Sequence, residues 1–286
     1  MARQRFPDAI VWITGGGSGI GRELALAFAR EGAHVAVSGR RRERLDEVVA
    51  AIEALGRRGL AVPCDVTVED SVVAAVQTVV DTLGALDVAV ANAGFSVAGR
   101  LEKLEVEDWR RQYETNVIGL VATAKAALPA LHRSRGRLVL IGSVAGEISV
   151  PGVLAYHSSK AAVRSIGQGL SMELHGSGVS CTTIQPGFVE SEIAQVDNRG
   201  HHDPTRRDPR PGKLMWRTDD AARVIVRAVY RRRRLYTFTW HGKAAVLLGR
   251  VFPGLLHLVV TRAGAGYDRQ AGAGRKRRSE RERDAG

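Results

Sequence analysis

A glycine-rich turn between an apolar run and a helical pattern is the feature that most restricts how this chain folds. Residues 10–13 are β-branched or aromatic, and residues 22–31 carry apolar positions at helical spacing. Glycines allow a tight turn and a close approach of the backbone to a ligand, and amides at a helix N-terminus attract negative charge. The order of strand, turn and helix predicts a binding site for the pyrophosphate of a dinucleotide. The candidate residues of this turn are Thr14, Gly15, Gly17, Ser18, Gly19, Ile20 and Gly21.

Strand and helix patterns alternate along the following residues. Apolar, β-branched runs predict strands at 34–38, 60–64, 86–90, 137–143 and 179–184, and helical spacing predicts helices at 42–55, 67–82, 106–131 and 155–174. Thr67 is expected to cap the second of these helices, and Thr218 a later helix that ends near residue 230, before a short strand at 235–238. This order predicts an α/β fold with one Rossmann-type domain, a doubly wound parallel sheet with helices on both faces.

The end of the second predicted strand bears on the choice of dinucleotide. An NAD site is expected to place Asp or Glu about 20 residues beyond the glycines, where it holds the ribose 2′-hydroxyl. Here Gly39 is followed by Arg40 and Arg41. Guanidinium groups bind a 2′-phosphate through charge-assisted hydrogen bonds, so the sequence predicts a preference for NADP(H) over NAD(H). The alternative is that these arginines only begin the next helix.

Polar and small residues follow the third, fourth and fifth predicted strands. They are Asp65, the segment Asn92, Ala93 and Gly94, and Ser143. The carboxyl ends of parallel strands meet at one edge of the sheet, which is where such folds bind ligands. We therefore expect these residues near the glycine turn, although Asp65 has an equally simple explanation as the cap of a local turn.

Tyr156 and Lys160 are spaced four residues apart in a predicted helix, so their side chains share a face. A neighbouring cation favours the phenolate, and a tyrosine with a lowered pKa can exchange protons with a substrate oxygen near neutral pH. An isolated pair of this kind is more often an ordinary surface pair, and the other motifs change that balance. Asn116 stands inside a predicted helix, where asparagine is unfavourable, and such residues are often functional.

Taken in order, these motifs resemble the short-chain dehydrogenase/reductase family over roughly residues 8–240. The glycine turn looks like the family's cofactor turn, and the Asn92 segment like its strand-four signature. Pro186 and Gly187 look like the family's segment beside the nicotinamide. The family's Asn-Ser-Tyr-Lys tetrad falls on Asn116, Ser143, Tyr156 and Lys160.

The resemblance implies a role for each residue. Tyr156 is the proton donor in reduction or the acceptor in oxidation, and Ser143 hydrogen-bonds the substrate carbonyl. Lys160 lowers the pKa of Tyr156 and holds the nicotinamide ribose, and Asn116 supports a water that links Lys160 to solvent. The further cofactor contacts that the family implies are Asp65, Val66, Asn92, Ala93, Gly94 and Val189. The family often forms dimers or tetramers through the helices that carry Asn116 and Tyr156, so a homo-oligomer is expected.

The charge of the chain is unevenly placed. Residues 1–198 hold 20 Lys and Arg against 22 Asp and Glu, whereas residues 199–286 hold 22 against 8. The basic last third suits nucleic acid, an anionic membrane surface or a solvated tail. We do not expect nucleic-acid binding, because no aromatic residues are interleaved with the basic ones and no known module is present. Cys64 and Cys181 have no metal-ligand spacing and are expected as free thiols in the cytoplasm, since no secretory pattern precedes them.

The segment from 188 to about 217 is polar and interrupted by prolines. We expect it to select the substrate and to close over the site as a lid. His201, His202 and Asp203 invite a metal interpretation, but no further ligand cluster accompanies them, so no metal is predicted.

Residues 241–262 form an apolar extension, and residues 263–286 a Gly- and Arg-rich tail expected to be disordered. The apolar part, 244–260, is too short and too interrupted by Arg250, Pro253 and His257 to span a membrane convincingly. It either lies in the interface of the inner membrane face, or packs over the substrate pocket or against a second subunit.

The sequence thus predicts an oxidoreductase that transfers hydride between NADP(H) and the carbonyl or secondary alcohol of a lipophilic substrate, of the ketone, aldehyde, steroid or fatty-acyl type. The competing class is a non-catalytic NADP(H)-binding scaffold at a membrane or partner surface. A complete tetrad argues against that scaffold, because a binding module has no need of Tyr156, Lys160 and Ser143 together.

Overall fold

The computed structural model describes residues 4–203, 205–206, 208, 210 and 212–262, so the predicted tail at 263–286 lies outside the described residues. A parallel sheet of seven strands runs through the centre of the chain in the order β3-β2-β1-β4-β5-β6-β7. The strands are β1 (Ile10–Thr14), β2 (His34–Gly39), β3 (Gly59–Pro63), β4 (Val88–Ala91), β5 (Arg137–Ile141), β6 (Ser180–Gln185) and β7 (Leu235–Thr237). The strand order reverses between β1 and β4, which is the point where doubly wound sheets bind ligands.

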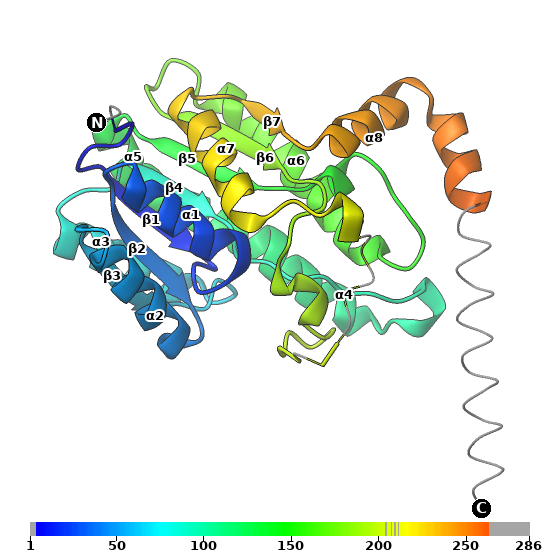
Figure 1. Cartoon of the computed structure of the whole chain (residues 1–286), viewed down its shortest axis with the longest axis horizontal. Coiled ribbons are helices and arrows are strands. Elements are labelled where there is room, and N and C mark those ends of the chain that lie inside the picture. The colour runs from blue at the N-terminus through cyan, green and yellow to red at the C-terminus, as the bar shows by residue number, and fades with distance from the viewer. Residues whose placement is uncertain (1–3, 204, 207, 209, 211, 263–286) are drawn as a thin grey trace, which may run out of the picture.

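Helices cover both faces of this sheet (Figure 1). One face carries α1 (Gly19–Arg30), α2 (Arg42–Glu53) and α7 (Thr218–Tyr230). The other carries α3 (Glu69–Leu83), α5 (Gly119–Ser134) and α6 (Leu154–Glu173). The remaining helices are α4 (Val106–Tyr113), α8 (Trp240–Val251), the π-helix η2 (Glu114–Ile118) and the 3₁₀ turns η1 (Leu101–Lys103), η3 (Val144–Gly146), η4 (Glu192–Gln195) and η5 (Gly212–Leu214).

The sheet divides the hydrophobic core into two parts. Successive side chains of a strand point to opposite faces, so Val11 and Ile13 of β1 join the core under α1 and α7, whereas Trp12 joins the core under α3 and α5. All three are fully buried. Strands buried on both faces read as continuous apolar runs, which is why β1 was recognisable from its sequence. The predicted doubly wound sheet with helices on both faces is confirmed.

Two predicted helix caps are wrong. The helix α3 has Val68 at its N-cap position, because Thr67 donates its hydroxyl to Asp65 Oδ1 (2.7 Å) instead. In α7 the N-cap is Arg217, and Thr218 is already the first helical residue, with its hydroxyl bonded to the Glu190 carbonyl (2.8 Å). In both cases a contact outside the helix takes the hydroxyl that a cap would use.

The long helix predicted from Val106 to about residue 131 is interrupted. One turn of π-helix, η2, separates α4 from α5, and Asn116 lies within it. A π-turn inserts an extra residue into the helical ladder and is frequent at functional sites. Here it places the Asn116 amide where it bonds the backbone of Phe95, in the segment that follows β4.

Candidate active site

A cavity of about 1230 Å³ opens at the carboxyl ends of the strands. Its walls come from the glycine turn, the ends of β2 and β4, the start of α6 and the segment after β6. Of the predicted site residues, all except Thr14 and Asn116 line this cavity. The structure therefore brings together residues that are up to 174 positions apart, from Gly15 to Val189.

Thr14 stands behind the cavity wall and joins two strand ends. Its hydroxyl oxygen accepts hydrogen bonds from the backbone N–H of Asn92 (3.1 Å) and donates to the Val90 carbonyl (3.3 Å). The Asn92 amide in turn donates to the carbonyls of Thr14 and Gly15, both at 3.0 Å. This buried exchange fixes the glycine turn against the end of β4.

Several positions of the glycine turn accept only glycine, because the backbone has a positive φ angle or passes close to other backbone atoms there. Gly15 and Gly19 have φ angles of 65° and 51°, in the left-handed region. A Cβ at Gly21 would lie 2.1 Å from the Gly15 carbonyl oxygen. At the N-terminus of α1, the cap residue Ser18 forms no side-chain cap hydrogen bond, so the helix N-terminus is presented to the cavity. These residues fit the pyrophosphate of a dinucleotide, which needs close backbone approach and the positive end of a helix.

Asn116 is buried behind the cavity and links the helices of the predicted tetrad. Its Nδ2 donates to the Phe95 carbonyl (3.1 Å) and to Ser159 Oγ (3.2 Å), and Ser159 donates to the Tyr156 carbonyl (2.7 Å). A Cβ at Gly94 would lie 3.0 Å from Asn116 Oδ1 and 3.8 Å from Lys160 Nζ. The absence of a side chain at Gly94 therefore keeps the space between Asn116 and Lys160 open.

Ser143 lies at the end of β5 and begins η3. Its Oγ accepts the Ala145 N–H (3.1 Å) and donates weakly to the Pro186 carbonyl (3.5 Å). The Ser143 side chain also lies beside Tyr156 and favours its phenolate, which lowers the pKa of Tyr156. The two hydroxyl groups that the sequence assigns to one substrate oxygen are thus adjacent in the structure.

The expectation of a lowered Tyr156 pKa is wrong for the described residues. Burial raises the pKa of Tyr156, and the Ser143 hydrogen bond and the charge of Arg210 offset only part of that rise. The Lys160 ammonium lies 5.8 Å from the centroid of the Tyr156 ring, and it donates to the Ile141 carbonyl (2.9 Å). Desolvation of the phenolate therefore outweighs the attraction of nearby cations.

Lys160 is 5% exposed, and burial lowers its pKa from 10.5 to about 8. The Ile141 carbonyl is its hydrogen-bond acceptor, and its ammonium faces the cavity. A buried amine with a pKa near 8 exchanges protons readily at physiological pH, which suits a proton relay.

Arg40 and Arg41 line the cavity at the end of β2, as predicted. Arg40 Nη2 donates to the Gly200 carbonyl (3.1 Å), and Arg41 Nη2 pairs with Glu192 Oε2 (3.3 Å). The alternative interpretation is partly correct, since Arg41 is also the N-cap residue of α2. Both guanidinium groups nevertheless face the cavity and the segment across it.

Asp65 combines both of its expected roles. Its carboxylate accepts hydrogen bonds from the N–H and hydroxyl of Thr67 (3.0 and 2.7 Å), which makes it the cap of a local turn. Asp65 and Val66 also line the cavity, next to the arginine end. Pro186, Gly187 and Val189 line it beside Ser143 and Tyr156.

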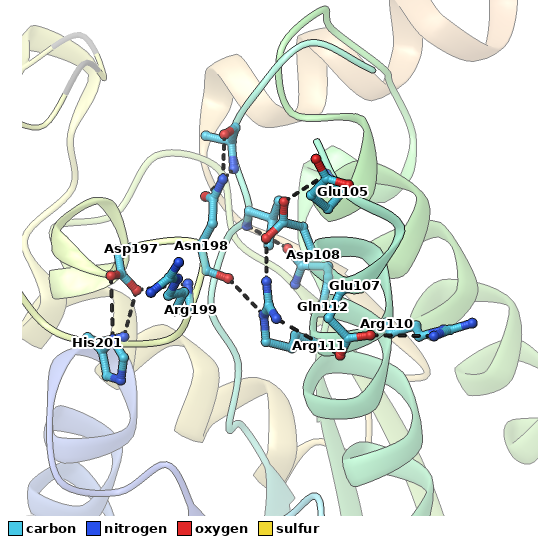
Figure 2. A network of polar contacts seen from close by, with 12 residues as sticks. Glu105, Glu107, Asp108, Arg110, Arg111, Gln112, Asp197, Asn198, Arg199 and His201 are labelled. Carbon is cyan, nitrogen blue, oxygen red and sulfur yellow. Dashed lines mark hydrogen bonds and ion pairs between the residues drawn. The ribbon is translucent and has the colours of Figure 1, made fainter. Parts of the chain in front are cut away.

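The segment after β6 crosses the cavity and is fixed on both sides. Asn198 exchanges two hydrogen bonds with the backbone of Ala98 (3.0 and 2.9 Å). Figure 2 shows Arg111 of α4 donating to the Asn198 carbonyl (3.3 Å). On the other side, Arg40 binds the Gly200 carbonyl. The described part of this segment thus lies across the cavity, and its closure as a lid stays a prediction.

Four residues that contribute to this site were not predicted from the sequence: Glu192, Asn198, Arg111 and Arg210. Arg210 Nη1 donates to the Val189 carbonyl (3.0 Å), and its Nη2 pairs with Asp208 (2.6 Å) and lies near Ser191. Arg210 and Glu192 belong to a stretch without helical or strand periodicity, and Arg111 reads as an ordinary surface residue of α4. No local signal identifies these contacts.

The two histidines that invited a metal interpretation lie beside carboxylates in the structure. His202 is 3.7 Å from Glu192, and His201 is 3.5 Å from Asp197.

Comparison with known proteins agrees with this geometry. The family profile described as short chain dehydrogenase matches residues 9–201. A protein named uncharacterized oxidoreductase from Myxococcus xanthus is 34% identical over 254 residues, which is 88% of this chain and 95% of that protein. An uncharacterized oxidoreductase from Staphylococcus aureus is 35% identical over 192 residues, or 67% of this chain and 82% of its own.

Solved structures share the fold over most of the chain. A short chain dehydrogenase/reductase from Burkholderia phymatum in complex with NAD is 25% identical, with a TM-score of 0.78 over 89% of this chain and 96% of its own. An alcohol dehydrogenase from Thermococcus sibiricus complexed with 5-hydroxy-NADP is 26% identical, with a TM-score of 0.70 over 80% of this chain and 95% of its own. Together with the profile match and the Ser143, Tyr156 and Lys160 geometry, these likenesses show that the chain belongs to the short-chain dehydrogenase/reductase family of oxidoreductases.

Proposed function

We propose that this oxidoreductase uses NADPH to reduce the carbonyl group of a lipophilic ketone or aldehyde, or catalyses the reverse oxidation with NADP⁺. The observation that carries the proposal is one continuous cavity with guanidinium groups at one end and a proton-transfer group at the other. Arg40 and Arg41 form the first end, and Ser143, Tyr156 and Lys160 the second. When bound, the nicotinamide supplies the hydride.

The protein's own groups then handle charge and protons. Hydride addition to a carbonyl carbon builds negative charge on the oxygen, which the hydroxyl groups of Ser143 and Tyr156 stabilise by donating hydrogen bonds. Tyr156 gives its proton to that oxygen. Burial raises the pKa of Tyr156, so the residue is protonated at neutral pH, which is the form that donates in reduction. Lys160, with a pKa of about 8, is placed to return the proton.

The preference for NADPH rests on charge at the end of β2. Relatives of known structure hold both kinds of cofactor, since one is complexed with NAD and another with an NADP analogue, so the family alone does not decide. Here β2 is followed by Arg40 and Arg41 where an NAD-binding chain places an acid. A 2′-phosphate beside two guanidinium groups gains charge-assisted hydrogen bonds that a ribose hydroxyl does not.

The lipophilic substrate class rests on the wall of the cavity near the catalytic end. Phe95, Ile193 and Val196 contribute apolar surface there, and Val196 packs against the small cluster around Phe95 and Ala155. Ala155 directly precedes Tyr156 in α6. An apolar wall beside the proton donor favours a substrate whose carbonyl is flanked by hydrocarbon.

The proposal is tested first by cofactor titration. We expect the purified chain to bind NADPH more tightly than NADH in titrations at fixed salt, with nicotinamide fluorescence as the readout. Arg40→Asp should lose NADPH affinity selectively. Arg42→Asp is the matched control, because it makes the same change of charge two residues away. Arg42 pairs with Asp46 and does not line the cavity. Equal affinities for both cofactors in the unaltered chain would refute the preference.

Turnover is tested separately, by NADPH oxidation with a panel of lipophilic ketones and aldehydes. Tyr156→Phe removes the proton donor and leaves the ring, so we expect activity to fall by about two to four orders of magnitude while NADPH binding persists. Full activity of this variant on a confirmed substrate would exclude the mechanism. Cofactor binding without turnover of any carbonyl would instead favour the non-catalytic scaffold.

We also propose that the chain forms a homo-oligomer through the helices that carry Asn116 and Tyr156. Ile118 and Val121, beside Asn116, are 51% and 39% exposed, which leaves apolar surface on this side of the molecule. Val121→Arg should lower the molar mass measured by light scattering. A mass unchanged by this substitution would argue against that interface.

A further inference from the structure

The C-terminal helices extend away from the body of the protein (Figure 1). Helix α8 is followed, after a bend of 118°, by a second helix, Pro253–Arg262. Large apolar side chains on both are exposed, among them Trp240 (68%), Leu247 (62%) and Phe252 (57%). Such a concentration of exposed apolar groups on one protruding element marks an interaction surface.

The exposed groups of α8 are arranged on one side. At 3.6 residues per turn, Trp240, Leu247 and Val251 fall within one narrow stripe of the helix. All three are exposed, and Lys243 lies beside the stripe. The small residues Gly242 and Gly249 face the body instead, where a Cβ at either would meet Val144 or Ile148 at 3.0 Å or less. The helix therefore packs on the body through its glycines and turns an apolar stripe outward.

The inner side of α8 is fixed to the loops that carry the active site. Arg250 Nη2 pairs with Glu147 Oε1 (2.7 Å), at the end of the turn that begins with Ser143, and the Glu147 side chain is 4% exposed. At the other end of α8, His241 Nε2 accepts the Phe188 N–H (3.2 Å) beside the Pro186 segment. The orientation of the outer stripe is thus tied to the orientation of the site.

The alternative in which this extension packs over the substrate pocket finds no support in the lining of the cavity. None of the described residues that line the cavity belongs to 240–262. A lipid surface and a second copy of the chain are then the two remaining partners from the sequence alternatives. Residues 240–262 contain Lys243, Arg250 and Arg262 and neither Asp nor Glu. Arg250 is paired with Glu147, so Lys243 and Arg262 decide the charge of this surface. Two copies would bring these like charges together, whereas an anionic bilayer surface is complementary to them.

The lengths of the two C-terminal helices restrict how they can bind a bilayer. In the described residues no single helix has the length and apolar character needed to cross a membrane. The 12 residues of α8 extend for about 18 Å, against about 30 Å of bilayer hydrocarbon. We propose that α8 and the helix Pro253–Arg262 form an anchor that lies in the surface of an anionic bilayer, with Trp240, Leu247 and Phe252 in the interface. Interfacial helices of this kind bury apolar side chains at the headgroup boundary and keep cations at the headgroups.

The anchor bears on substrate supply, a consequence that also rests on the proposed function. Because α8 is braced against the turn that begins with Ser143, surface attachment would keep the active site close to the bilayer. A lipophilic carbonyl compound concentrated in the bilayer would then be available near the site.

The experiment is sedimentation of the full chain with phosphatidylcholine vesicles, with and without phosphatidylglycerol. We expect binding to the anionic vesicles that weakens with salt. The double variant Leu247→Gln, Phe252→Gln should lower the partition coefficient roughly a hundredfold, from the loss of two buried apolar side chains. Leu101→Gln, Met172→Gln is the matched control, since these residues are similarly exposed (63% and 62%) but lie on the body.

Three results would overturn the proposal. The chain would fail to sediment with anionic vesicles, or the anchor variant would bind as well as the control, which would assign binding to the basic tail. Alternatively, the unaltered chain would be an oligomer that the anchor variant dissociates, without vesicle binding, which would identify a second copy as the partner. None of these measurements uses turnover, so they are independent of the proposed reaction.

Discussion

Lys160 is expected to destabilise the fold that it serves, and the size of that effect follows from its burial. Its pKa falls from 10.5 to about 8 because desolvation disfavours the ammonium form. A shift of this size corresponds to about 3 kcal/mol between the folded and unfolded states. The pKa in the folded state is the lower one, so between pH 8 and 10.5 the unfolded chain binds more protons. Stability therefore rises with pH through that window, and the full penalty is present below it.

The informative substitution is Lys160→Met, which keeps the length of the side chain and removes the charge. It also leaves the Ile141 carbonyl without the ammonium donor, at a cost of about 1–3 kcal/mol that does not depend on pH. The absolute stability of the variant near neutral pH is thus a balance of two similar quantities. The change with pH in the difference between the unfolding free energies of the variant and the unaltered chain is more informative. The cost of the lost hydrogen bond is the same at both pH values and cancels when they are compared.

The assay is urea unfolding without cofactor, near pH 7 and near pH 10, for both chains. We expect the variant to lose about 2–3 kcal/mol relative to the unaltered chain between these pH values, as the penalty on Lys160 is relieved. Lys125→Met is the control, since Lys125 is exposed and pairs only at the surface with Glu69, and its difference should change by less than about 1 kcal/mol. If the difference in unfolding free energy between Lys160→Met and the unaltered chain changed as little with pH as that of the control, the reasoning would be refuted.

Other predictions follow from the cavity wall. Glu192→Gln removes the carboxylate that pairs with Arg41 and should tighten NADPH binding about two- to fivefold in a fluorescence titration, whereas unchanged affinity would show that the pair does not compete with the cofactor. Gly21→Ala places a methyl group 2.1 Å from the Gly15 carbonyl oxygen and should abolish cofactor binding and lower the melting temperature, whereas an unchanged NADPH affinity would show that the turn does not require glycine here. Because burial raises the pKa of Tyr156, kcat/KM for reduction should show no loss attributable to Tyr156 ionisation at neutral pH; a decline assigned to Tyr156 below its ordinary value of 10 would contradict this.

The parts of the fold that sequence predicts well are those set by local pattern. The buried strand around Trp12 reads as an apolar run because both of its faces are covered, and Gly21 is required by a contact only six residues away. Local spacing is enough in these two cases. For the tetrad it places only Tyr156 and Lys160 on one helical turn, and the assignment of Asn116 and Ser143 came from the resemblance to the family.

What sequence missed depends on contacts between distant segments. The π-turn at Asn116 forms where the amide reaches the Phe95 backbone, 21 residues away, and no helical period encodes that bond. Glu192 meets Arg41 across 151 residues. The Tyr156 pKa was misjudged because the argument considered the neighbouring cation and not the desolvation of the phenolate, which only the packed structure displays.

The charge of the cavity comes from two parts of the chain. Residues 1–198 are nearly neutral overall, with 20 basic against 22 acidic side chains, and their contribution to the described cavity lining is also balanced, with five Arg or Lys against four Asp or Glu. The excess comes from Arg199 and Arg210, which belong to the basic last third and reach the cavity in the segment that crosses the strand ends. Within low-dielectric walls such an excess focuses a positive potential on the site. The cavity of this chain is thus suited to hold a polyanionic dinucleotide.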